Sequence, residues 1–137
     1  MKTFHELTDD VERRQAIANT VFAHLRKQGR RAVDKVRDVC VYRTADGLKC
    51  AVGCLIPDEL YDKGIEGAGM SLDFTSQRRW KLWDILWNIG IRAEDGQLME
   101  VLQMLHDSER NWGEKGISED AIRDVCALLK LQYTPPK

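Results

Sequence analysis

Two short β-rich runs around an Asp-Gly turn restrict the fold of this chain more than any other feature of its sequence. The run VCVYR, residues 39–43, precedes the turn TADG, and the run LKCAV, residues 48–52, follows it. β-branched and aromatic residues on both sides of an Asp-Gly pair are typical of a β-hairpin. We therefore expect an antiparallel hairpin over residues 39–52.

The length of the turn also predicts the register of this hairpin. A turn of four residues pairs the two residues that flank it, Arg43 and Leu48. Alternation along each strand then gives one apolar face and one mixed face, as a half-buried hairpin requires. The expected apolar face consists of Val39, Val41, Cys50 and Val52, and the mixed face consists of Cys40, Tyr42, Lys49 and Ala51.

Four other segments carry the periodicity and the end signals of α-helices. The expected helices span 10–28, 76–89, 96–109 and a last segment that starts after Ser118. The first has a capping Asp9 and a left-handed stop at Gly29. Before the last, Ile117 and Ile122 have the spacing of a hydrophobic staple, which favours a helix start at this point.

These elements together predict an α+β fold in one domain over residues 1–137. About four helices pack around a small antiparallel β-hairpin in this architecture. The tail YTPPK, residues 133–137, contains two prolines and cannot continue a helix, so we expect it to be frayed.

Composition and charge argue against several functional classes. The chain has 137 residues, of which 43% are hydrophobic, and 21 Lys and Arg against 22 Asp and Glu give a net charge of −1. A chain so close to neutral has no overall field that attracts nucleic acid or an anionic membrane. Its apolar runs are too short for a transmembrane helix, and its acidic start is unlike a signal peptide. We therefore expect an intracellular protein without a membrane span.

Three cysteines and one histidine suggest a zinc site as an alternative. The candidate ligands are Cys40, Cys50, Cys54 and His106. Structural zinc sites bring two close ligands around a tight turn. Here the close pair is C-x-x-x-C, and the predicted register directs Cys40 and Cys50 to opposite faces. We favour packing roles for the thiols and expect no metal or other cofactor.

The same residues could support thiol catalysis, because a cysteine, a histidine and an acidic group form the general pattern. Cys50 or Cys54 would be the nucleophile, His106 the base and Asp107 the group that orients it. Adjacent helical residues point about 100° apart, so Asp107 is poorly placed for this role. A packed His106 bonded to the backbone is the favoured interpretation.

Basic residues raise nucleic-acid binding as a further alternative. One group surrounds the end of the first helix and consists of Arg26, Lys27, Arg30, Arg31, Lys35 and Arg37. A second group, Arg78, Arg79 and Lys81, lies beside Trp80. Arginines next to aromatic rings can bind nucleic acid by stacking and by phosphate contacts. The first group also complements the negative end of its helix, which is a sufficient structural role.

The helix predicted over 76–89 carries more apolar surface than one stripe requires. One side consists of Leu82, Ile85, Leu86 and Ile89, and another side consists of Trp80, Trp83 and Trp87. Either the helix is central and both sides are core, or the tryptophan side binds a partner. The residues of this candidate partner-binding site are Arg78, Arg79, Trp80, Trp83 and Trp87.

The segment 40–59, CVYRTADGLKCAVGCLIPDE, resembles a segment of small uncharacterised proteins of tailed bacteriophages and prophages. LQMLHD, residues 102–107, is similar to a second segment of that family, as is Tyr61 with Glu66 and Gly67. The resemblance covers about the middle half of the chain and brings no catalytic residues. It implies a phage-encoded accessory protein that acts in the cytoplasm of a bacterial host.

From these observations we expect a protein that is not an enzyme and binds a host or phage protein. An inhibitor of a bacterial defence system, in the manner of an anti-CRISPR protein, is one such role. The alternatives are a cysteine- or zinc-dependent enzyme built on Cys50, Cys54 and His106, and a nucleic-acid-binding protein. The latter would use the segment RRAVDKVRD, residues 30–38, which we expect to be a basic connector or a short helical turn, together with Arg78, Arg79 and Trp80.

Overall fold

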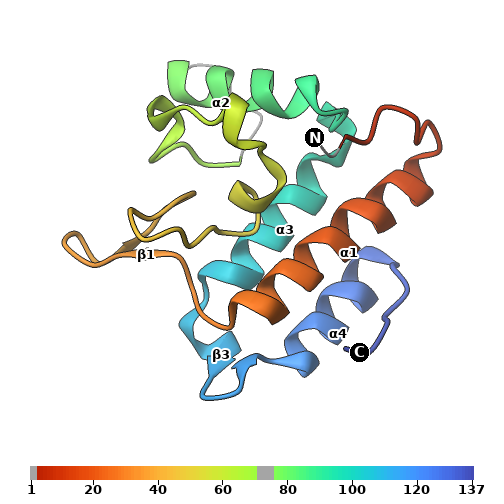
Figure 1. Cartoon of the computed structure of the whole chain (residues 1–137). Helices are drawn as coiled ribbons and strands as arrows, with labels where there is room; N and C mark the ends of the chain where they lie inside the picture. Colours follow the sequence, from red (N-terminus) through yellow and green to blue (C-terminus); the bar gives the residue numbers. More distant parts are fainter. Residues whose placement is uncertain (1–2, 71–75) are drawn as a thin grey trace.

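The computed structural model describes residues 3–70 and 76–137, and it confirms the α+β prediction (Figure 1). The four α-helices are α1 (Asp10–Gln28), α2 (Gln77–Asn88), α3 (Gly96–Asp107) and α4 (Glu119–Leu129). Two small antiparallel sheets join them, β1 (Val33–Asp34) with β2 (Val39–Cys40), and β3 (Trp112–Gly113) with β4 (Gly116–Ile117). α3 packs against both α1 and α4, while α2 packs against the 3-10 turn η3 (Lys63–Ile65). All four helices and the irregular segment 50–70 contribute buried residues to one core.

The first helix has the ends that its sequence predicts. The Asp9 carboxylate accepts a hydrogen bond of 2.9 Å from the backbone N–H of Glu12. Gly29 ends the helix at a φ of 77°, and its N–H donates to the carbonyl of Leu25. Ile17 and Val21 on the predicted stripe are fully buried. This amphipathic helix consequently provides one wall of the core.

The other helix boundaries lie close to the predicted positions. The Ser118 hydroxyl caps α4 by accepting from the N–H of Ala121 at 3.2 Å, and the staple residues Ile117 and Ile122 are both buried. α3 ends at Asp107 rather than Glu109, because the backbone becomes extended at Ser108. None of the helices in residues 3–70 and 76–137 is long and apolar enough to cross a bilayer.

The predicted register of the hairpin is wrong by one residue. Arg43 bridges Lys49 instead of Leu48, and the N–H of Cys50 donates to the carbonyl of Tyr42. The reason is the Thr44 side chain, whose hydroxyl accepts a hydrogen bond of 2.9 Å from the N–H of Leu48 and adds a residue to the turn. A shift by one residue reverses the faces of a strand.

The paired strands with regular backbone hydrogen bonds lie earlier in the chain than the predicted hairpin. β1 and β2 pair Val33 with Cys40, and the turn between them lies in the basic segment that was predicted to be a connector. The Asp34 carboxylate organises this turn by accepting from the backbone N–H groups of Val36 and Arg37. The predicted assignment of residues to an apolar and a mixed face is therefore wrong, since Val39 is 47% exposed and Tyr42 is only 5% exposed.

The Glu66 side chain takes the place of a neighbouring strand beside residues 42–43. Its carboxylate accepts from the backbone N–H of Tyr42 at 2.9 Å, from the N–H of Arg43 at 3.2 Å and from the Tyr61 hydroxyl at 2.6 Å. On the other side of Tyr42, Gly53 passes so closely that a Cβ atom there would overlap the Tyr42 carbonyl oxygen. The hairpin is thus held by side-chain contacts and close packing more than by a sheet.

A buried ion pair joins the start of α1 to the start of α3. The Arg13 guanidinium donates two hydrogen bonds of 2.8 Å to the Asp95 carboxylate, and both side chains are 0% exposed. Arg14 adds a bond of 3.0 Å to Asp95, as does the backbone N–H of Arg92. Every oxygen of the buried carboxylate is therefore matched by donors, which offsets its loss of hydration.

The C-terminal segment after α4 contacts the helices as far as Thr134. The Tyr133 hydroxyl donates to Glu119 at 2.7 Å, and the Arg123 guanidinium lies over the Tyr133 ring. Arg26 donates to the Thr134 carbonyl oxygen. Fraying of the tail stays a prediction, and these contacts limit it to the residues that follow.

Replacement of Asp95 by Asn should lower the free energy of unfolding by about 3 kcal/mol, because it removes the buried counter-ion of Arg13 and leaves only the exposed carboxylate of Asp10 beside that charge. The combined variant Arg13→Met/Asp95→Leu should recover much of this loss. Urea unfolding followed by circular dichroism measures both. If Asp95→Asn is as stable as the parent protein, the pair does not hold the two helices together.

The same pair predicts a pH dependence. Burial alone would raise the pKa of Asp95, but the hydrogen bonds from Arg13 and from the Arg92 N–H outweigh it and lower the pKa below its usual range. The stabilisation is thus present above the ordinary carboxyl pKa of about 4 and is lost as the pH falls through the lower folded-state value. The stability difference between parent and Asp95→Asn should shrink across this acid range. A difference that grows on acidification would contradict this assignment.

Candidate functional site

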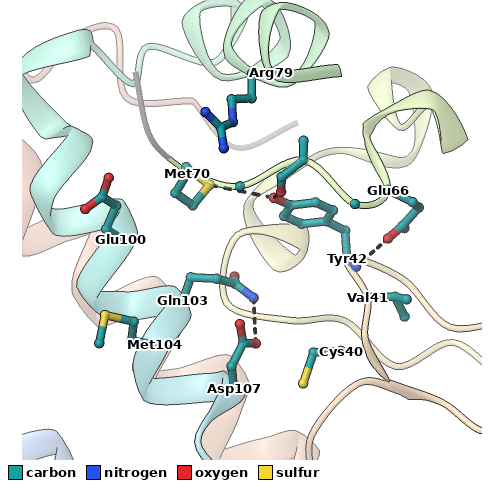
Figure 2. A pocket seen from close by; sticks show the side chains of 13 residues that line it. Cys40, Val41, Tyr42, Glu66, Met70, Arg79, Glu100, Gln103, Met104 and Asp107 are labelled. Carbon is teal, nitrogen blue, oxygen red and sulfur yellow. Dashed lines mark hydrogen bonds between the residues drawn. The ribbon is translucent and has the colours of Figure 1, made fainter. Parts of the chain in front are cut away.

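A cavity of about 410 Å³ opens between β2, the segment 66–70 and α3 (Figure 2). Cys40 and Asp107 lie at one edge of it, and Arg79 and Glu100 lie at the other. Gln103 reaches from α3 and donates a hydrogen bond of 2.8 Å to Asp107. This cavity contains the thiol and carboxylate nearest to His106, so any chemistry based on these residues would take place here.

The His106 ring is fixed on both nitrogens behind this edge. Its Nε2 atom accepts a hydrogen bond of 2.9 Å from the backbone N–H of Ala32, so the ring proton must lie on Nδ1. Nδ1 donates to the Asp107 carboxylate at 2.7 Å. Trp112 packs edge-on against the fully buried ring, at 6.0 Å between centroids. The prediction of a packed histidine bonded to the backbone is therefore confirmed.

The expectation that Asp107 is poorly placed for His106 is wrong. The angle of about 100° between adjacent helical residues describes their Cα–Cβ bonds, and the two side-chain rotamers close the remaining gap. The interaction fixes a tautomer, but it does not create a general base. The nitrogen that would accept a proton, Nε2, already accepts from Ala32.

The four candidate zinc ligands of the alternative interpretation, Cys40, Cys50, Cys54 and His106, do not come together. The Cys50 sulfur accepts a hydrogen bond from the N–H of Gly53, and the Cys54 thiol donates to the Ala51 carbonyl at 3.0 Å. A different group, Cys40 with His106 and Asp107, has its ligand atoms within 4.8 Å of one another.

This second group has the wrong donor chemistry for zinc. Coordination through Nδ1 of His106 would require a proton on Nε2, where it would face the N–H of Ala32. Coordination through Nε2 would leave that N–H buried without an acceptor. His106 can therefore bind a metal only at the expense of a backbone hydrogen bond.

Cys40, Cys50 and Cys126 do not have the character of catalytic nucleophiles. Burial raises the pKa of the fully enclosed Cys50 and also that of Cys126. At Cys40 burial again has the largest effect, the charge of Asp107 raises the pKa further, and Arg31 opposes the rise only in part. Nucleophilic cysteines have the opposite shift, because the thiolate is the reactive form.

The tryptophan side of α2 is part core and part surface. Trp83 is fully buried, whereas Trp80 is 49% exposed and Trp87 is 37% exposed. The rings of Trp80 and Trp87 meet edge to face, with 6.3 Å between centroids. Seven residues separate them on the helix, so they share one side. We call Trp80 and Trp87 the aromatic pair, and Trp83 leaves the set of candidate surface residues.

The two arginines of the predicted site diverge from the aromatic pair. Arg78 donates a hydrogen bond of 2.6 Å to the Glu66 carbonyl oxygen, and Arg79 lines the cavity of Figure 2. The predicted residues thus belong to four environments rather than to one surface. Lys81, which is ion-paired with Asp62 at 3.1 Å, is the exposed cation of α2 that follows Trp80 in the chain.

Most cations of the basic group around the end of α1 form ion pairs or hydrogen bonds with other residues of this protein. Arg26 forms an ion pair of 2.7 Å with Glu119, and Lys35 lies 3.8 Å from Asp46. Arg31 donates to the Asp107 carbonyl oxygen. These contacts give the three cations structural roles. In the nucleic-acid alternative, the same cations would bind phosphate groups.

Comparisons with protein-family models, with curated proteins and with solved structures give no match for this chain. The candidate site is therefore defined by its geometry alone. Sequence analysis did not identify the acceptor role of Glu66 or the donor role of Ala32. It also missed Arg13, although this residue continues the stripe of Ile17 at a spacing of four.

Native-state alkylation tests the description of the thiols. Cys50 and Cys126 should react with iodoacetamide only as fast as the protein unfolds, and Cys40 should react more slowly than free glutathione, because burial keeps these groups protonated. Mass spectrometry of digested samples measures each rate. The urea-unfolded protein, in which all four cysteines should react quickly, is the control. Rapid alkylation of one cysteine in the native state would support the enzyme alternative.

Proposed function

We propose that this protein acts by non-covalent binding to a partner protein and not by catalysis, with the aromatic pair on α2 as the main contact. The observation that carries the proposal is the exposure of Trp80 and Trp87 on one side of a helix whose other apolar residues are buried. Tryptophan is among the residues most enriched at the energetic centres of protein interfaces.

The aromatic pair offers enough apolar surface to matter for affinity. Each ring exposes roughly 100 Å², and its burial contributes about 2 kcal/mol. The edge-to-face contact limits the motion of both rings before binding, so little side-chain entropy is lost on association. The neighbouring Asp84 and Lys81 are exposed and can supply the polar rim of an interface.

The partner that we propose is a host or phage macromolecule, and inhibition of a bacterial defence system is one role that fits. The support for this choice is the resemblance of segment 40–59 to small phage proteins. The enzyme alternative is weaker because burial raises the pKa of Cys50 and because both nitrogens of His106 are engaged by the fold.

Loss of the aromatic pair should abolish partner capture without loss of the fold. Immobilised protein should retain a specific binding partner from a lysate of bacterial cells, and Trp80→Ser/Trp87→Ser should retain at least about tenfold less of it, since two ring contacts are removed. Quantitative mass spectrometry of the bound fraction measures the ratio.

The matched control is Val11→Ser/Leu128→Ser, which removes two apolar side chains that are 69% and 65% exposed on other helices. It should bind as the parent protein does. Thermal unfolding of both variants verifies that each is folded. Equal capture by the tryptophan variant and the parent would refute the proposed surface.

A further inference from the structure

A groove of about 810 Å³ runs beside the β1–β2 hairpin, on a different side of Glu66 from the cavity described above. Its walls are the β1–β2 turn at 35–37, the turn at 44–46 and the residues Tyr61, Lys63 and Arg78. We call it the hairpin groove. Figure 1 shows the β1–β2 hairpin projecting from the body of helices.

The charges that line the hairpin groove are mainly positive. Its cations are Lys35, Arg37, Arg43, Lys63 and Arg78, and its carboxylates are Asp34, Asp46 and Glu66. Two of the carboxylates are already engaged by the fold. Asp34 accepts from the backbone of its own turn, and Glu66 accepts from two backbone N–H groups and from the Tyr61 hydroxyl. Lys35 lies 3.8 Å from Asp46 and Arg37 lies 3.3 Å from Asp34, so these two pairs cancel. Lys63 and Arg78 then leave a ligand in the groove with a small surplus of positive charge.

Two of these cations are available to a ligand. In the part of the chain that the structure describes, neither Lys63 nor Arg78 lies within ion-pair distance of a carboxylate, and both are exposed. The hydrogen bond of Arg78 to the Glu66 carbonyl oxygen holds its guanidinium at the groove without neutralising it.

A third cation is fixed at the base of the groove. The Arg43 guanidinium lies 4.5 Å from the centre of the Tyr61 ring and pairs with Asp58 at 2.8 Å. Its Nε atom is buried and has no hydrogen-bond partner. Its position is set by stacking on Tyr61, by a hydrogen bond of 2.6 Å to the Ile56 carbonyl oxygen and by the pair with Asp58, which offsets its charge.

Apolar surface accompanies these charges. Val36 at the tip of the hairpin is 95% exposed and Val39 is 47% exposed, so neither contributes fully to the core. Such side chains fit the apolar residues of a peptide better than a phosphate backbone. The interspersed carboxylates also disfavour a continuous polyanion, and Arg43 already occupies one face of the Tyr61 ring, so that face cannot stack with a base.

We propose that the hairpin groove binds an extended acidic segment of a partner protein. Carboxylates of the segment pair with Lys63 and Arg78, and an apolar side chain of the segment packs against Val36. This interaction does not depend on the aromatic pair, and the two surfaces can be tested separately.

Selection from a displayed library of random short peptides tests the proposal with a defined probe. Peptides selected on the parent protein at about 0.15 M salt should be rich in Asp and Glu and carry an apolar residue. A synthetic copy of the best peptide should bind Lys63→Glu/Arg78→Glu about tenfold or more weakly by fluorescence anisotropy. Val36→Asp should weaken it as well.

The matched control is Arg110→Glu/Lys115→Glu, which changes the net charge equally at exposed positions near β3. It should bind the peptide as the parent does, and so should Trp80→Ser/Trp87→Ser. If Lys63→Glu/Arg78→Glu fails to fold, Lys63→Glu alone serves as the variant, and it should also weaken binding. The proposal is overturned if selection enriches no acidic peptide, if charge reversal leaves binding unchanged, or if the groove binds labelled single-stranded DNA instead.

Discussion

The buried ion pair between Arg13 and Asp95 is the constraint on which the arrangement of the helices depends. It joins the first turn of α1 to the residue before α3, across 82 positions of the chain. An unpaired charge in this place would be strongly unfavourable, so the two helix starts can only be buried together. Once α1 and α3 are paired, α4 packs against α3, and the segment 50–70 fills the space below α2.

The same principle explains the residues that look chemical in the sequence. His106 accepts from the Ala32 N–H, Glu66 substitutes for a strand beside Tyr42, and Asp95 neutralises Arg13. Each is a polar group that satisfies another buried polar group in a protein with very little sheet. Surfaces rather than buried groups are then left to carry the function, and we assign this role to the aromatic pair and to the hairpin groove.

Local signals in the sequence were sufficient for the helices. Asp9, Gly29 and Ser118 mark ends that depend only on nearby residues, and the structure has them at the predicted positions. The hairpin was predicted less well, because its register depends on the Thr44 hydroxyl and its edge on Glu66, which is distant in sequence. The alternation of apolar and polar residues gives no sign of the Thr44 hydrogen bond or of the Glu66 contact.

The candidate site was predicted only in part for the same reason. Helical spacing places Trp80, Trp83 and Trp87 near one another, but burial of Trp83 depends on the neighbours that tertiary packing brings to it. The contact between His106 and Asp107 depends on side-chain rotamers, and the spacing argument excluded it incorrectly. The hairpin groove joins segments far apart in the chain and has no local signature.

The central claim is that His106 is a structural residue whose two nitrogens are committed to the fold. Its tautomer tests this most directly, by long-range ¹H–¹⁵N NMR of the histidine rings near neutral pH, with and without added zinc. The account predicts a protonated Nδ1 and an unprotonated Nε2, with no change on addition of the metal. A protonated Nε2, or a zinc-induced shift of either nitrogen, would contradict it.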